Sequence, residues 1–196
     1  MTTMDRISEA EYLVRERAAD YRSEYVAGRV YFMAGASRPH NVIALNVAGL
    51  LHGQLRGRPC EAYAADMRVK IRATGLYTYP DVVVVCGRPD LEDANCDTVL
   101  NPVVIMEVIS PSTEAYDRGE KFAHYRRLDS VVEYVLIAQD RMRVEHFSRE
   151  GERWSFVELA EPASVLELGS IGCALRLGDI YERLELLPFS ELPLRV

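Results

Sequence analysis

Lysine is almost absent from this sequence. Only Lys70 and Lys121 occur among its 196 residues, although the chain contains 21 arginines. The formal net charge is −7, which argues against a protein that coats nucleic acid without specificity. It does not exclude a protein that docks phosphates, because a local basic surface is enough for that purpose. Because arginine supplies nearly all of the basic residues, we look for a specific role for each of the two lysines.

Closely spaced cysteines are absent as well. The four cysteines are far apart and form no CxxC pair: Cys60, Cys86, Cys96 and Cys173. Zinc modules usually need closely spaced ligand pairs, so this spacing argues against one. Because free cysteine is among the most buried residue types, we expect reduced and mostly buried thiols.

No apolar run approaches the roughly 20 residues that a membrane-spanning helix needs. The longest runs, over residues 82–86 and 131–138, have the length of buried strands. The first residues contain no apolar stretch of the signal-peptide type. We therefore expect a cytoplasmic protein with no membrane partner.

Linkers, internal repeats and low-complexity tracts are also missing. Hydrophobic residues make up 48% and charged residues 27% of the chain, which is an ordinary globular balance. At roughly 100–200 residues per domain, this length favours a single domain over residues 1–196.

Apolar patterning predicts an α/β (α+β) fold whose central mixed sheet is flanked by helices. Helical spacing indicates the helices, and alternation or continuous β-branched runs indicate the strands. The core order is α-β-β-β-α-β: a helix over 40–55, strands over 66–72, 82–86 and 103–109, a helix over 118–128 and a strand over 131–138. A Ser8–Glu11 capping box with a following hairpin precedes this core, and a hairpin over residues 143–159 follows it.

Two acids interrupt the buried runs. Asp81 stands at the start of the run 82–86, and Glu107 stands near the end of the run 103–109. Burying a lone carboxylate costs several kcal/mol, so such acids are expected to be paired or metal-bound. Sequential strands are usually neighbours, which would bring both carboxylates to one end of the sheet. A divalent cation relieves their repulsion, and oxygen donors without nearby cysteine favour Mg²⁺ or Mn²⁺.

Each acid also has a structural interpretation. An aspartate that follows a proline at a strand start commonly caps a turn, and for Asp81 taken singly this is the commoner role. Glu107 could form a buried salt bridge instead. A third acid in a buried run, Glu133, is interpreted as the partner of a core arginine. Asp81 and Glu107 together, in this strand order, favour a metal site.

The surrounding motifs resemble one protein family. They are Pro80-Asp81, Glu107-Val-Ile-Ser-Pro-Ser-Thr, Asp117-Arg-Gly-Glu-Lys121-Phe-Ala-His-Tyr125 and Val132-Glu-Tyr134, with Glu24-Tyr-Val-Ala-Gly28 and Pro39-His40 before them and Leu177-Gly-Asp-Ile-Tyr181 after them. Together they resemble the Uma-type family of restriction-endonuclease-like proteins, in the PD-(D/E)XK superfamily, over nearly the whole chain. The resemblance implies a core in which an acid opens the second strand and Glu-x-Lys lies on the third.

The sequence departs from that pattern at Ile109, which stands two residues after Glu107 where the superfamily has lysine. The resemblance implies that the following helix supplies the basic group, and there this chain has Lys121. A lysine in that place could stabilise developing negative charge or orient an attacking water. The alternative is an exposed Lys121 that pairs with Asp117 at i, i+4. The rarity of lysine in this chain favours the functional role.

Three further residues are accessory candidates. Lys70 is the second choice for the role of the basic group, although its alternation with Arg68 and Arg72 also fits a solvated or phosphate-contacting strand face. His40 begins a long helix and matches a family position, but a helix-terminal surface histidine fits equally well. Glu24 is a candidate third metal ligand, because superfamily members often draw one from the N-terminal region.

These residues and the resemblance predict a metal-dependent endonuclease that hydrolyses DNA phosphodiester bonds with Mg²⁺ or Mn²⁺. Asp81 and Glu107 would hold the cation, and Lys121 would support the transition state. The rival interpretation is a non-catalytic nuclease-fold protein with a structural or protein-binding role, in which Ile109 reflects lost chemistry. A small-molecule hydrolase has no nucleophile-plus-base motif to support it. A homodimer stays open as the assembly.

Overall fold

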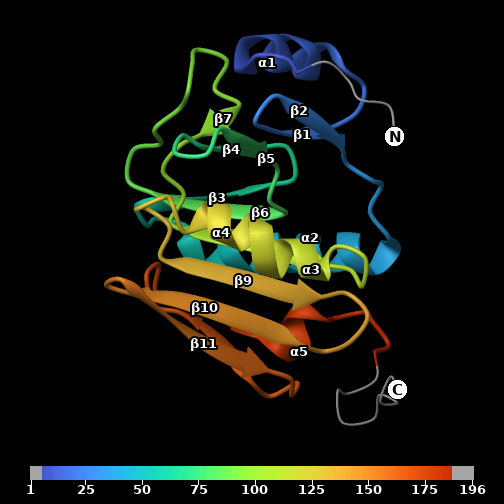
Figure 1. Cartoon of the computed structure of the whole chain (residues 1–196). Coiled ribbons are helices and arrows are strands. Elements are labelled where there is room, and N and C mark those ends of the chain that lie inside the picture. Colours follow the sequence, from blue (N-terminus) through green and yellow to red (C-terminus); the bar gives the residue numbers. More distant parts are fainter. Residues whose placement is uncertain (1–5, 187–196) are drawn as a thin grey trace.

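The structure, a computed structural model, describes residues 6–186. Its strands form a six-stranded sheet, a five-stranded sheet and a two-stranded ribbon. Figure 1 shows helix α1 and the five-stranded sheet, in blue to green, at one end of the molecule, and β9, β10 and β11, in orange, at the other. Within residues 6–186, no helix is both long and apolar enough to cross a membrane.

The six-stranded sheet forms the centre of the molecule. Its order is β11-β10-β9-β8-β6-β3, with the bounds β3 Cys60–Ala64, β6 Val82–Cys86, β8 Val104–Ile109, β9 Glu133–Ala138, β10 Val144–Glu150 and β11 Arg153–Leu159. Strands β8 and β9 run parallel and the other pairs run antiparallel, so the sheet is mixed, as predicted. Strands β6 and β8 are neighbours, which confirms the prediction for the two valine-rich runs.

Helix α2 (Arg38–Leu55) covers one face of this sheet. Its buried residues recur at helical spacing: Ile43, Val47, Leu51 and Leu55. Ser37 caps the helix by accepting a hydrogen bond from the His40 N–H at 3.3 Å, and Pro39 lies in the first turn, where its missing N–H costs nothing. The ribbon of β12 (Val165–Leu168) and β13 (Cys173–Arg176) and the short helix α5 (Leu177–Ile180) complete this layer.

The five-stranded sheet and the helical segment after β8 cover the opposite face. The sheet has the order β2-β1-β5-β4-β7, with the bounds β1 Ser23–Val26, β2 Arg29–Phe32, β4 Arg68–Ile71, β5 Leu76–Thr78 and β7 Thr98–Val99. The helical segment consists of α3 (Glu114–Tyr116), a π-helical turn η1 (Asp117–Lys121) and α4 (Phe122–Tyr125). Side chains of both parts pack against the central sheet in one apolar cluster. Helix α1 (Glu9–Ala18) opens with the predicted capping box.

The predicted strand over residues 66–72 lies in the five-stranded sheet as β4, so its expected place in the core was wrong. Strand β3 takes that place, and the core order α-β-β-β-α-β holds with this replacement. Strand β3 is an edge strand with partly exposed residues and no apolar run, so its sequence signal is weak. The polar face of β4 is covered by ion pairs, and Arg68 is only 3% exposed.

The helical segment after β8 begins earlier than predicted. Asp117 was expected to cap it, but the segment starts at Glu114, whose N–H bonds the Ser110 carbonyl at 2.9 Å. Asp117 lies inside the segment and is buried. A π-helical turn holds an extra residue, and such turns often occur at functional sites. Here the turn contains both Asp117 and Lys121, and both are buried in it.

Cys60 and Cys86 form a disulfide across β3 and β6, so the expectation of reduced thiols was wrong for this pair. The two residues are 26 positions apart in the sequence but directly opposed in the antiparallel register. Sequence spacing does not reveal such a pairing, because it depends on which strands become neighbours. Cys96 is free and exposed, and Cys173 is free and buried.

The disulfide predicts how many thiols react with Ellman's reagent. Without reductant, native protein should show one reactive thiol, that of Cys96, and denatured protein a second, that of Cys173. Reduction should release two more and lower the free energy of unfolding by about 3 kcal/mol, because the bond closes a loop of 26 residues. A Cys96→Ser control should lose the fast-reacting thiol without losing stability. Four thiols in unreduced, denatured protein would show that the disulfide does not form.

Candidate active site

The antiparallel register of β6 and β8 brings Asp81 and Glu107 together. Val82 pairs with Met106, so Asp81, one residue before β6, lies opposite Glu107. Opposed residues in antiparallel strands direct their side chains to the same face of the sheet. That face is covered by the helical segment and the five-stranded sheet. The two acids that interrupt the buried runs therefore share one site.

Two contacts hold the carboxylate of Asp81. Its Oδ2 accepts a hydrogen bond from the Val108 backbone N–H at 2.7 Å, and its Oδ1 lies 3.1 Å from Nε2 of His40. The side chains of Asp81 and His40 are 20% and 22% exposed, so they form the side of the site that is nearest to solvent. Asp81 thus binds the backbone of the neighbouring strand, which goes beyond capping a turn of its own.

Glu107 lies deeper in the same site and is only 4% exposed. Its Oε1 accepts a hydrogen bond from the Tyr125 hydroxyl at 2.8 Å and lies 2.9 Å from Nζ of Lys121. Burial raises the pKa of Glu107 to about 8; the Lys121 ammonium opposes this rise, and the carboxylates of Asp117 and Asp81 add to it. The site therefore holds a carboxyl group that keeps its proton to a higher pH than an ordinary glutamate does.

The ammonium of Lys121 lies among three carboxylates. Its Nζ is 2.9 Å from Glu107, 3.1 Å from Glu24 and 3.6 Å from Asp117, and the side chain is 6% exposed. Burial works to lower the pKa of Lys121, but these carboxylates hold it well above its ordinary value, so the lysine is charged at neutral pH. The alternative of an exposed Asp117–Lys121 pair was therefore wrong about exposure, although the pair itself exists.

Glu24 reaches this cluster from β1 of the five-stranded sheet. Its carboxylate accepts hydrogen bonds from the Thr78 hydroxyl and from the Tyr116 hydroxyl, the latter at 3.3 Å. Its contact with Lys121 links the five-stranded sheet to the helical segment. The site is thus assembled from both sheets and from the helix between them.

Carboxylates outnumber the buried ammonium in this cluster, which comprises Lys121 with Asp81, Glu107, Glu24 and Asp117. Burial raises the pKa of Asp117, and the neighbouring acids Glu24 and Asp81 add to the rise against the opposing charge of Lys121. Among residues 6–186, no three or more Asp, Glu, His or Cys side chains are grouped so that they could hold a metal ion. A Mg²⁺ ion often takes only one or two protein carboxylates and keeps several waters, so any such ion here would have to rely on Asp81 and Glu107 with water.

Lys70, the second choice for the basic group, lies outside the cluster. Its Nζ is 2.8 Å from Glu9 and 2.6 Å from Glu92, and it stands 4.8 Å from the centroid of the Tyr77 ring. Neither acid belongs to the site. These contacts tie β4 to α1 and to the loop before β7, which is a structural role.

Glu133 also lies outside the cluster, on β9. It accepts hydrogen bonds from the Ser170 backbone N–H at 3.3 Å and from the Ser170 hydroxyl at 3.0 Å, and burial raises its pKa. The interpretation that Glu133 pairs with a core arginine was therefore wrong, because a serine takes that place. Glu133 provides a matched buried glutamate for comparison with Glu107.

Sequence reasoning did not assign three residues that contact the cluster: Thr78, Tyr116 and Tyr125. Tyr125 stands four residues after Lys121, and this spacing places both on one helix face, which is a usable signal. Thr78 and Tyr116 carry no such signal, because their contacts with Glu24 join separate elements of the fold.

Known proteins resemble this chain in sequence and structure. The family model Uma2, described as "Putative restriction endonuclease", matches residues 9–177. "Uncharacterized protein sll1609" from Synechocystis sp. is 38% identical over 160 residues, which cover 81% of this chain and 90% of that protein. "Uncharacterized protein slr1290" from the same organism is 33% identical over 179 residues, which cover 91% and 93%.

A solved structure is similar as well. The crystal structure of "a putative nuclease belonging to DUF820" from Anabaena variabilis matches this chain with a TM-score of 0.69 at 17% sequence identity. The match covers 83% of this chain and 91% of that chain. The predicted restriction-endonuclease-like α+β fold is thereby confirmed.

The burial of Lys121 predicts a pH-dependent loss of stability in Lys121→Met. The variant leaves Glu107, Glu24 and Asp117 without their cation, and breaking a buried pair in this way typically costs about 3–5 kcal/mol. The pKa of Glu107 is raised to about 8, so the stability that its bound proton contributes is full below the unfolded pKa of glutamate and is lost as pH rises toward 8. At pH 8 the ionised Glu107 depends on the charge of Lys121, which the variant lacks. Urea unfolding should show the larger loss at pH 8 and a smaller loss at pH 5, where native Glu107 is protonated.

Lys70→Met is the matched control for this experiment. It removes the other lysine, whose side chain is 14% exposed and whose partners lie outside the cluster. We expect a smaller loss of unfolding free energy that is similar at the two pH values. Equal losses for Lys121→Met at pH 5 and pH 8 would contradict the coupling between Lys121 and Glu107.

Proposed function

This chain belongs to the Uma2 family, and we propose that it is a metal-dependent endonuclease that hydrolyses phosphodiester bonds in DNA. One observation carries the proposal: Asp81 and Glu107 lie opposite each other on adjacent strands, and Lys121 from the next helical segment lies 2.9 Å from Glu107. Two carboxylates that hold a cation, with one ammonium beside them, would be suited to bind and polarise a phosphodiester. Lys121 takes the role that a lysine at position 109 would have.

The donor set supports Mg²⁺ or Mn²⁺ as the cofactor. Asp81 and Glu107 are oxygen ligands from a rigid sheet, and no cysteine lies among the residues of the cluster, so a hard cation is favoured. When bound, such a cation neutralises charge on a phosphate and lowers the pKa of a water molecule. Glu107 and Asp81 would hold it.

The protein's own groups define the rest of the mechanism. The Val108 N–H and His40 hold the Asp81 carboxylate, and the Tyr125 hydroxyl holds Glu107, so both ligands are positioned before substrate arrives. Lys121 is charged at neutral pH, which makes it a source of electrostatic stabilisation for negative charge on the phosphate and excludes it as a general base. The exposure of Asp81 and His40 indicates the side from which the phosphate approaches.

A purely structural role is a weak explanation for this cluster. Replacing a whole buried ion pair by well-packed apolar residues is often neutral or even stabilising, so stability alone is a weak reason to retain the cluster, although removing one partner is costly. The rival role, a nuclease fold without catalysis, is favoured by Ile109, which is buried at 2% exposure in the position of the usual lysine. The position of Lys121 offers a replacement for that missing charge.

Cleavage assays test the proposed reaction. Wild-type protein should nick plasmid DNA in Mg²⁺ or Mn²⁺, and EDTA should abolish the nicking. Lys121→Met should reduce the rate by roughly 10²–10³-fold, the scale for removing one preorganised electrostatic interaction. Lys70→Met should retain the wild-type rate. All variants are compared at a temperature at which circular dichroism shows them folded.

The failure of this assay would be informative. Wild-type protein that binds Mn²⁺ but cleaves neither DNA nor RNA would favour the non-catalytic role. Full activity in Lys121→Met would remove Lys121 from the mechanism.

A further inference from the structure

A groove between the end of α4 and the β10–β11 hairpin lies apart from the carboxylate cluster. Its volume is about 350 Å³, and its main polar and aromatic lining consists of Arg126, Arg127, Arg149, Glu152 and Trp154. The backbone N–H of Arg149 donates to the carbonyl of Val132, just before β9 begins. Glu107 lies opposite Leu136 in the register of β8 and β9, farther along β9. The groove is therefore near the opposite end of β9 from the cluster.

Within the described residues, the arginines of this groove have no ionic partners. Arg118 and Arg143 each pair with Glu145, but Arg126, Arg127 and Arg149 have no carboxylate in ion-pair range within residues 6–186. Three positive charges thus face one lining acid, Glu152, in a chain whose net charge is −7. This local excess of positive charge is complementary to a polyanion.

Aromatic rings and backbone carbonyls hold two of these arginines in place. Arg149 Nη2 donates to the carbonyls of Arg126 at 2.9 Å and Leu128 at 3.0 Å, and its guanidinium stands 4.9 Å from the centroid of the Trp154 ring. The guanidinium of Arg126 stands 5.0 Å from the centroid of the Phe122 ring. These contacts fix the Arg149 guanidinium against the floor of the groove and orient its charge.

An exposed aromatic ring extends the groove along β11. Trp154 and Phe156 are two residues apart on this strand, so they lie on the same face. Phe156 is 54% exposed, and its ring packs 5.0 Å from that of Phe147. Arginines beside exposed aromatic rings are the elements with which proteins bind single-stranded nucleic acid, because bases stack on the rings and phosphates bind the arginines.

We propose that this groove binds a single-stranded segment of nucleic acid, with phosphates at Arg126 and Arg127 and a base on Phe156. The choice of nucleic acid rests on the proposed function, whereas the affinity for anions and flat rings rests on the residues of the groove. An acidic peptide would satisfy the arginines but would leave Phe156 without a stacking partner. The groove would thus hold a strand of the substrate at a distance from the reacting phosphate.

Trp154 provides a direct probe, because it is the chain's single tryptophan. A thymidine oligonucleotide of about 12 nucleotides, within the site sizes of single-strand binders, is titrated in EDTA so that cleavage cannot occur. We expect a saturable change in Trp154 fluorescence, with the same Kd as the anisotropy of a labelled oligonucleotide. Binding without a change at Trp154, or no binding, would overturn the proposal. Equal affinity for a poly-glutamate peptide would show a dock for acidic proteins instead.

Substitutions locate the binding to the groove. Arg126→Ala and Arg127→Ala should each weaken oligonucleotide binding and lower the slope of log Kobs against log salt by about 0.7 for each phosphate that the variant no longer binds. Phe156→Ala should weaken it by roughly 5- to 150-fold, the range for one stacked base. Glu152→Gln should strengthen it, because it removes the acid of the groove.

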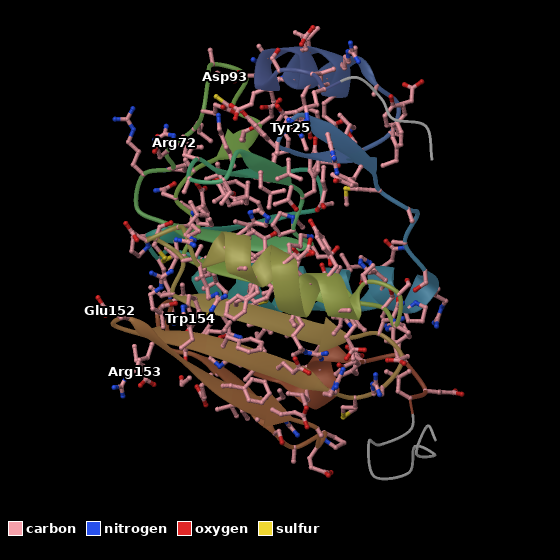
Figure 2. All side chains as sticks on the ribbon, viewed as in Figure 1. Tyr25, Arg72, Asp93, Glu152, Arg153 and Trp154 are labelled. Atoms are coloured by element: carbon pink, nitrogen blue, oxygen red, sulfur yellow. A yellow bond between two sulfur atoms is a disulfide. The ribbon has the colours of Figure 1, made fainter. Side chains whose placement is uncertain are left out.

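Arg153→Ala is the matched control for charge. Figure 2 shows Trp154 on the side of the hairpin toward α4, whereas Arg153 points away from that helix. The control removes one exposed arginine from the same hairpin and should leave the Kd nearly unchanged. A loss as large as that of Arg126→Ala would show that general surface charge binds the strand, which contradicts a groove site.

The proposed hydrolysis and the proposed groove site can each be contradicted without the other. Lys121→Met should lose cleavage and keep the oligonucleotide Kd. Wild-type protein that binds through the groove without cleaving would overturn the proposed hydrolysis and leave the groove standing. Cleavage with full oligonucleotide affinity in the groove variants would overturn the groove and leave the hydrolysis standing.

Discussion

The attraction between Lys121 and the carboxylates around it is the interaction on which the site depends. The ammonium lies 2.9 Å from Glu107 and 3.1 Å from Glu24 with little solvent between them, where Coulomb attraction is far stronger than in water. It offsets the cost of burying the acids. Because Glu24 belongs to one sheet and Glu107 to the other, the same interactions join the two sheets through the helical segment. The candidate catalytic lysine is thus also a structural tie.

The tie leaves negative charge in excess. Lys121 faces several acids, and the raised pKa of Glu107 reflects its burial beside Asp117 and Asp81. Protonation of Glu107 relieves part of this excess, because its pKa is raised to about 8, and a divalent cation would relieve it once that proton is lost. Asp81 lies on the solvent side of the cluster, so a phosphate could reach a cation held by its carboxylate. The groove of Arg126 and Trp154 has the opposite charge, so it can attract a polyanion directly, whereas the carboxylate cluster would need a bound cation to do so.

Much of this arrangement could be predicted from local patterns. The β-branched runs around Asp81 and Glu107 indicated buried strands, and two acids inside such runs indicated a shared purpose, which the register of β6 and β8 supports. The helical spacing of apolar residues correctly located α2. Such patterns report how each residue is buried along its own element, which is why they worked at these positions.

Features that depend on partners far away in the sequence could not be predicted in this way. A lysine four residues after Asp117 has the same pattern whether it is exposed or buried, and only the π-helical turn and the approach of Glu24 decide between the two. Strand β3 is partly exposed, so its residue pattern did not indicate that it belongs to the central sheet. The Cys60–Cys86 disulfide depends on that position and could not be predicted either. The arginine groove forms where the β10–β11 hairpin lies beside α4, and the sequence pattern does not show that these elements are neighbours.

Titration calorimetry with Mn²⁺ tests most directly whether the two opposed carboxylates form a cation site. Wild-type protein should bind one ion, and Glu107→Gln and Asp81→Asn should each abolish the binding. Glu133→Gln, which changes a buried glutamate of the same sheet that lies outside the cluster, should bind Mn²⁺ as the wild type does. Unchanged binding in Glu107→Gln and Asp81→Asn would contradict the metal site and reduce these acids to a structural role.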